Sequence, residues 1–121
     1  MKQPVFLSYD LGFQGDYLNL YKWLDSHDAL ECGDSFCRFI YDFTTVENMR
    51  SEEDTRSMIQ EIRKDLTSVV SFSNTDRAYL VSEFYVKDSI KMAGVFLVGK
   101  RKQANPWDGA SGAEEYQGID E

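Results

Sequence analysis

The spacing of apolar residues alternates between strand-like and helix-like patterns in a fixed order along this chain. A short β-prone run at 4–9 is followed by apolar residues at i, i+3, i+4 and i+7, which predict a helix over 16–27. This stripe consists of Tyr17, Leu20, Tyr21 and Leu24. Asp16 is a suitable N-cap because its carboxylate can accept the free amide protons of the first turn. Trp23 lies off the stripe, and we favour a core position for it over a surface anchor.

The remaining elements follow from the same patterns. Two β-prone stretches at 29–32 and 36–43 flank the turn residues Gly33-Asp34-Ser35 and predict a hairpin. Ser51 and the acidic residues after it predict the start of a helix over 52–66. Its inward stripe is Met58, Ile59, Ile62 and Leu66. Two further strands are predicted at 77–85 and 92–100, with a turn around 87–89 between them.

The resulting order is β-α-β-β-α-β with an extra C-terminal strand. It predicts an α+β fold of the ferredoxin-like type, an antiparallel sheet with two helices on one face. The other face and the edges of such a sheet stay available. Because two helices alone cannot cover all of the apolar residues, we expect a homodimer that assembles through the sheet.

Composition places the chain among globular proteins. It has 121 residues, of which 42% are hydrophobic and 14% aromatic, enough for a single core. We predict one domain at 1–102 and a flexible acidic tail at 103–121, because the tail has no periodicity that would bury a face. No apolar run approaches the roughly 20 residues of a membrane span, so we expect a cytoplasmic protein without membrane association.

The charge disfavours a general nucleic-acid binder, since the formal net charge is −8. Five of the 21 acidic residues lie in the tail, which leaves 16 acidic against 13 basic residues in the rest of the chain. The basic cluster Lys100, Arg101 and Lys102 is the one candidate for a phosphate contact, or for a contact with the acidic tail itself.

The cysteines and the single histidine give no catalytic signature. Cys32 and Cys37 are separated by four residues, which fits neither a redox CxxC motif nor a zinc site, and we interpret them as reduced thiols. His27 comes at the predicted C-terminus of the first helix, where a histidine is favourable. No cofactor is expected from these residues.

Three short segments of the sequence resemble a known superfamily. They are SYD at the end of the first strand, LYKWL in the first helix, and ECGDS before an aromatic strand. Together with the element order over about 4–102, they make the chain similar to the superfamily of CRISPR-associated protein 2 and virulence-associated protein D. That resemblance implies a ferredoxin-like homodimer. It also implies that Asp10, at the end of the first strand, is a metal ligand near the two-fold axis of an endonuclease.

Asp10 therefore has two interpretations. As a metal ligand, two copies of Asp10 across a dimer axis would share one Mg²⁺, which prefers oxygen ligands and could activate a water for phosphodiester hydrolysis. As a structural residue, Asp10 would accept hydrogen bonds from amides of the following loop. Basic residues are sparse in the sequence around the first strand, which favours the structural role.

The sequence thus leaves two functions open. The first is a small, non-enzymatic, homodimeric protein-interaction module that assembles through its sheet and binds a partner through the acidic tail. The alternative is a Mg²⁺-dependent endonuclease or nucleic-acid-end binder, with Asp10 as ligand and Lys100, Arg101 and Lys102 as phosphate contacts.

Overall fold

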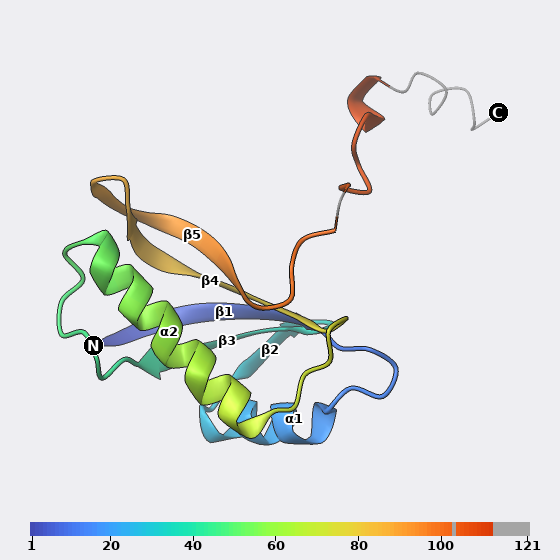
Figure 1. The fold of residues 1–121 in the computed structure, drawn as a ribbon, viewed down its shortest axis with the longest axis horizontal. Helices are drawn as coiled ribbons and strands as arrows, with labels where there is room; N and C mark the ends of the chain where they lie inside the picture. Colours follow the sequence, from blue (N-terminus) through green and yellow to red (C-terminus); the bar gives the residue numbers. More distant parts are fainter. Residues whose placement is uncertain (103, 113–121) are drawn as a thin grey trace.

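The structure is a computed structural model that describes residues 1–102 and 104–112. Its elements are β1 (Lys2–Asp10), α1 (Tyr17–Ser26), β2 (Leu30–Gly33), β3 (Phe36–Asp42), α2 (Glu52–Val69), β4 (Arg77–Val86), β5 (Ser89–Val98) and a short 3₁₀ helix at Ala110–Gly112 (Figure 1). The α+β class and the predicted order of elements are confirmed. The predicted tail falls partly on residue 103 and residues 113–121, which lie outside the described part.

The five strands form one sheet in the order β2-β3-β1-β4-β5. Each strand pairs antiparallel with its neighbours, and β1 lies at the centre between β3 and β4. Five antiparallel strands with two helices are compatible with the ferredoxin-like arrangement expected from the sequence. The two edges of the sheet are the short β2 and the long β5.

Both helices cover the same face of this sheet (Figure 1). Trp23 of α1 contacts Phe39 edge to face, with ring centroids 5.5 Å apart. Asp65 of α2 accepts a hydrogen bond of 2.7 Å from the Tyr41 hydroxyl. Since Phe39 and Tyr41 are two residues apart in β3, they point to one side, and the opposite face of the sheet is left uncovered. No helix in the described ranges is long and apolar enough to cross a membrane.

The core lies between the helices and the sheet. Val5, Leu7 and Leu80 on the central strands are fully buried, as are the α2 residues Met58 and Ile62. Burying such a side chain contributes about 1.5–3 kcal/mol, so this layer supplies most of the driving force for folding. The alternate residues of β1 and β3 face the uncovered side.

Helix α1 confirms the predicted N-cap and corrects the predicted stripe. The Asp16 carboxylate accepts the amide proton of Asn19. Trp23 is buried, as favoured, but Tyr21 is 53% exposed and does not belong to the core. Its ring instead lies against Tyr9 and Tyr17 at the edge of the helix. The core contacts come from Leu20, Trp23 and Leu24 because the helix is rotated so that the indole faces β3.

Helix α2 begins at the predicted N-cap and runs beyond its predicted end. The Ser51 hydroxyl accepts the amide proton of Asp54, and the Asp54 carboxylate accepts the amide proton of Arg50 at 2.7 Å. The helix continues to Val69 rather than ending at 66. The three added residues carry no helix breaker, and the chain leaves the helix at Val70 in an extended conformation.

Strand β5 begins three residues before its predicted start at Met92. The loop to β4 contains only Lys87 and Asp88, which have φ values of 49° and 67°. Two consecutive left-handed residues are typical of the type I′ turn of tight hairpins. The closing pair is therefore Val86 and Ser89, and the strand extends to the turn itself.

Candidate functional site

The uncovered face of the sheet carries a row of side chains that crosses four strands. Phe36 of β3 is opposite Ser8 of β1, Ser8 is opposite Tyr79 of β4, and Tyr79 is opposite Phe96 of β5. We call these four residues the aromatic row. Ser8 alternates with the buried Leu7, so the row lies on the side away from the helices.

The rings of this face are ordered by contacts with one another. Phe6, next along the same face of β1, stacks on Phe36 with centroids 5.7 Å apart and an interplanar angle of 10°. Tyr79 meets Phe96 edge to face at 4.7 Å. A Cβ atom at Gly94 would overlap the Tyr79 phenol, so the missing side chain is what allows this ring to lie across β5. The open face is thus a preformed aromatic surface.

Asp10 lies at one end of this face and is paired with Arg77. The Arg77 guanidinium donates a hydrogen bond of 2.9 Å to the Asp10 carboxylate. The two residues are cross-strand partners on β1 and β4. The Asp10 side chain is 68% exposed, so this ion pair adds little to stability. Basic residues are sparse in the sequence around the first strand, but sheet pairing brings Arg77 to Asp10 from a distant part of the sequence.

A pocket of about 250 Å³ connects Asp10 with the aromatic row. It is lined by Ser8, Asp10, Arg77, Tyr79, Phe96 and Arg101. The Arg101 guanidinium lies over the Phe96 ring, 5.8 Å from its centroid, where the ring quadrupole attracts a cation. The structure therefore brings together Asp10 and Arg101, two of the residues singled out in the sequence. Lys100 and Lys102 are exposed and do not line this pocket.

A magnesium ion at Asp10 would need ligands besides this one carboxylate. Among the described residues, no three His, Cys, Asp or Glu side chains are grouped so that they could hold a metal ion. A cation at Asp10 would also have to displace the Arg77 guanidinium. Cys32 and Cys37 are both free, with Cys32 exposed and Cys37 buried, as expected for reduced thiols.

The structural interpretation of Asp10 predicts that it accepts amide protons from the following loop. In the structure Asp76 has this role instead. This carboxylate is 1% exposed and accepts the amide protons of Gly12 at 2.7 Å and Ser73 at 2.8 Å. Burial raises the pKa of Asp76, but the hydrogen bonds from these two amides outweigh burial and hold the pKa below its usual value. The sequence placed Asp76 in a polar turn and contained no signal that the turn would meet the loop after β1.

Asp16 reinforces the same junction between loops. Its carboxylate accepts the amide proton of Ser71 at 2.9 Å in addition to capping α1. The hydrogen bond from Ser71, followed by that from the Asn19 side chain, lowers the pKa of Asp16. The two carboxylates thus fix the loop before α1 against the loop before β4, next to the end of β1 that carries Asp10.

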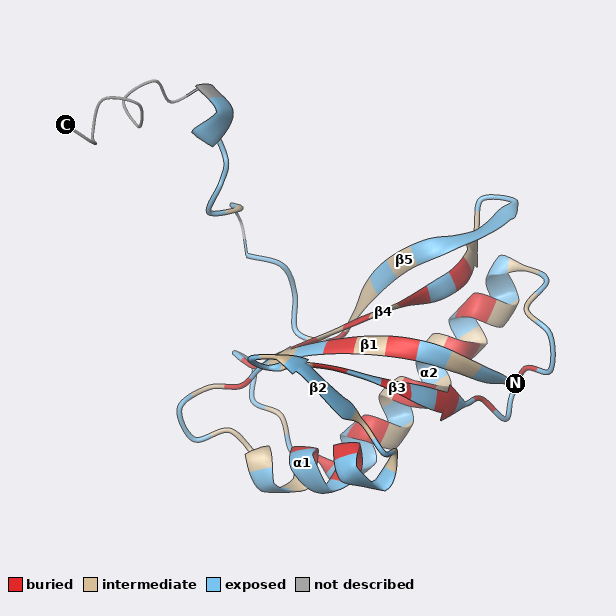
Figure 2. Ribbon diagram, turned by 180° about the vertical axis from the view of Figure 1, so that it is seen from behind, coloured by how far each residue is buried: buried red, intermediate tan, exposed pale blue. Residues whose placement is uncertain are grey.

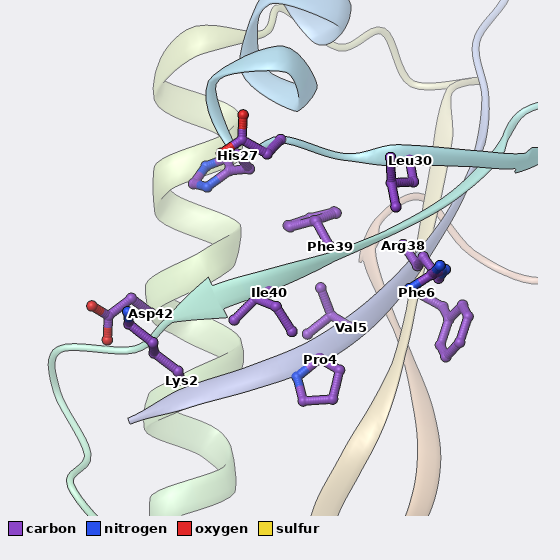
Figure 3. Close-up of a pocket in the computed structure, with 11 residues that line it drawn as sticks. Lys2, Pro4, Val5, Phe6, His27, Leu30, Arg38, Phe39, Ile40 and Asp42 are labelled. Carbon is purple, nitrogen blue, oxygen red and sulfur yellow. The ribbon is translucent and has the colours of Figure 1, made fainter.

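A second hollow lies where β2 stops pairing with β3 (Figure 3). It has a volume of about 380 Å³ and contains Leu30 and Ile40, which are both 55% exposed. Pairing between the two strands ends at Leu30 and Arg38, so β3 has no strand partner beyond that point on its outer side. This hollow is a break in the edge of the sheet, and His27, Asp28 and Asp42 are among the residues that line it.

Comparison with known proteins assigns no family to this arrangement. No family model, no curated protein and no solved structure matches the chain. The function is therefore inferred from the chemistry of the sheet surface and of the sheet edges.

Proposed function

We propose that this chain is a small, non-enzymatic interaction module of ferredoxin-like fold that forms a homodimer through the outer edge of β5. The observation that supports it is the free edge of β5, a strand of ten residues with a partner on one side only. An unpaired edge of this length presents a row of backbone donors and acceptors to another strand. Dimerisation would satisfy these groups.

The tight hairpin determines which β5 residues form that edge. The closing pair Val86 and Ser89 exchanges backbone hydrogen bonds, and the direction of the backbone groups alternates from there. Lys91, Ala93 and Val95 consequently bond to β4. The N–H and C=O groups of Ile90, Met92 and Gly94 point outward, so these are the groups offered to a second strand.

The side chains of this edge are suited to association. Ile90 is 51% exposed and Met92 is 57% exposed, and most of the strand is accessible (Figure 2). The strand contains one charged residue, Lys91, and no proline. Charges, prolines and shortened strands are the usual means by which edges are protected from pairing, and β5 has little of this protection.

A two-fold axis is the symmetry that suits such an edge. Two β5 strands that pair antiparallel present the same residues to one another, as an isologous interface requires. The sheets of both copies would then form one continuous sheet, with the helices of both on one side. This geometry leaves the uncovered faces, with their aromatic rows, accessible.

Replacing Met92 with lysine is expected to convert the dimer to a monomer, because each copy would then bring a further positive charge to the paired edge. Leu18→Lys is the matched control, since Leu18 is 66% exposed on α1 and lies outside the edge. Light scattering coupled to size exclusion should give twice the 14.0 kDa chain mass for the wild type and for Leu18→Lys, and a single chain mass for Met92→Lys. A wild-type protein that stays at a single chain mass at high micromolar concentration would refute the proposal.

The alternative function, a Mg²⁺-dependent endonuclease or nucleic-acid-end binder, is favoured by one observation, the shared pocket of Asp10 and Arg101. If it is right, wild-type protein cleaves RNA or DNA in Mg²⁺ and Asp10→Ala does not. Asp42→Ala removes an exposed carboxylate from a different strand, β3, and serves as the control. Because Arg77 holds Asp10, we expect no cleavage by any of the three proteins. Cleavage that is lost only in Asp10→Ala would establish the nuclease.

We also propose a partner contact through the acidic tail and a cytoplasmic location. A partner contact through the acidic tail relies on residues 113–121, outside the described part, and on Trp107, which is 68% exposed. A cytoplasmic location is consistent with the two free thiols.

A further inference from the structure

We propose that the uncovered face of the sheet binds single-stranded nucleic acid, with bases stacked on the aromatic row and on Phe6, and with backbone phosphates at Arg38 and Arg101. This binding goes beyond the proposed homodimer, because it uses the open face and not the β5 edge. It also requires neither a metal ion nor cleavage.

The arrangement of the rings suits a strand that crosses the sheet. The aromatic row runs perpendicular to β3, β1, β4 and β5, so successive positions are separated by the spacing between strands, about 4.8 Å. Phe36 and Tyr79 are two strands apart, and the small Ser8 between them leaves the surface hollowed at the row. Phe6 and Phe96 extend the stacking surface along and across the strands.

Cations accompany the rings on the same face. Arg38 is the cross-strand partner of Phe6, and the two side chains lie close together (Figure 3). Arg101 lies over Phe96, and Arg77 reaches the pocket beside Tyr79. Within the described residues, neither Arg38 nor Arg101 forms an ion pair. Each is therefore available to a phosphate.

The acidic balance of the chain does not oppose this binding locally. Helix α2, on the covered side of the sheet, carries five acidic residues. They are Glu52, Glu53, Asp54, Glu61 and Asp65. On the open face itself, the charge of Asp10 is compensated by Arg77. Asp42 and Glu83 also lie on this face, farther along β3 and β4 from the aromatic row. The net charge of −8 therefore does not describe the surface immediately around the rings.

The combination of partly exposed rings and arginines selects single strands. Every base has a π-face, so stacking on aromatic side chains is tolerant of sequence and contributes about 1–3 kcal/mol per base. In a duplex these faces are already occupied by neighbouring bases, and the rings would have nothing to contact. Four-stranded sheets that expose aromatic residues bind RNA single strands in this way.

The test is fluorescence anisotropy of short labelled oligonucleotides, measured in EDTA with full-length protein. We expect binding to single-stranded RNA or DNA and weaker binding to a duplex of the same sequence. Phe96→Leu should weaken single-strand binding about tenfold. Its matched control, Tyr21→Leu, removes an exposed ring from α1 and should change nothing. Arg101→Gln should weaken binding and reduce its salt dependence, whereas Arg56→Gln on α2 should do neither.

The outcomes are separable from those of the dimer proposal. Circular dichroism melting establishes that each variant is folded, and light scattering shows whether Phe96→Leu and Arg101→Gln keep the wild-type mass. A variant that keeps this mass but loses single-strand binding supports the open face as the site. A preference for RNA over DNA would indicate contact with the 2′-hydroxyl, and equal affinity would indicate stacking and phosphate contacts alone; both support the proposal. The proposal is overturned if single strands do not bind, if duplex binds equally well, or if Phe96→Leu binds like the wild type.

Discussion

Replacing Asp76 with alanine is expected to lower the free energy of unfolding by about 3 kcal/mol, because two backbone amides lose a charged acceptor. Gly12 and Ser73 donate to this carboxylate at 2.7 and 2.8 Å, and the residue is 1% exposed. Without it the amides are left without their acceptor in a place that water reaches poorly. The loop after β1 and the loop before β4 would then separate. Urea unfolding followed by circular dichroism measures the change.

The pH dependence of the same residue follows from its lowered pKa. The folded-state pKa of Asp76 lies below the ordinary aspartate pKa of 3.8, so its contribution to stability is complete above pH 3.8 and is lost as the pH falls through the folded-state pKa. Asp76→Asn keeps one acceptor oxygen and should cost less than Asp76→Ala. It should also reduce the loss of stability below pH 3.8. Equal stability of wild type and Asp76→Ala at neutral pH would show that the two amides do not depend on this carboxylate.

Replacing Gly99 with alanine is expected to cost about 2 kcal/mol of folding stability. Gly99 has a φ of 78°, a left-handed conformation that a Cβ atom disfavours. A Cβ atom there would also overlap the backbone carbonyl of Asp76, which cannot move aside like a flexible side chain. The chain after β5 would therefore have to shift, and Arg101 would leave its position over Phe96.

Gly109 provides the control that separates conformational strain from overlap. Its φ of 82° is close to that of Gly99, but a Cβ atom at Gly109 would meet no atom within 4 Å. Gly109→Ala should therefore cost less than Gly99→Ala and should leave the environment of Phe96 unchanged. Thermal unfolding gives the stabilities, and the aromatic NMR signals of Phe96 report the position of Arg101. If the two variants are equally stable, overlap with Asp76 does not contribute.

The order of elements could be predicted because it depends on local patterns. Apolar spacing identified both helices and all five strands, and the N-caps Asp16 and Ser51 marked the helix starts. Strand and helix boundaries that depend on backbone geometry were harder to predict from the sequence. The start of β5 depends on the left-handed conformation of Lys87 and Asp88. These residue types do not by themselves predict a type I′ turn. The exposure of Tyr21 likewise depends on how α1 is rotated against the sheet.

The candidate site could be predicted only in part, because it depends on pairing between distant strands. Asp10 and Arg101 were both identified from the sequence, but their shared pocket requires β1, β4 and β5 to be neighbours. The ion pair of Asp10 with Arg77 depends on the register between β1 and β4, and so does the alignment of the aromatic row. A shift of one residue would move Ser8 and its neighbours in the row to the opposite face.

Amide hydrogen exchange along β5, followed residue by residue by NMR at increasing protein concentration, tests assembly through this edge most directly. The outward amides of Ile90, Met92 and Gly94 should exchange fast in dilute protein and slow down as the dimer forms. The amides of Lys91, Ala93 and Val95, which bond to β4, should stay protected at every concentration. Outward amides that exchange fast at all concentrations, including those at which a dimer is present, would contradict the β5 interface.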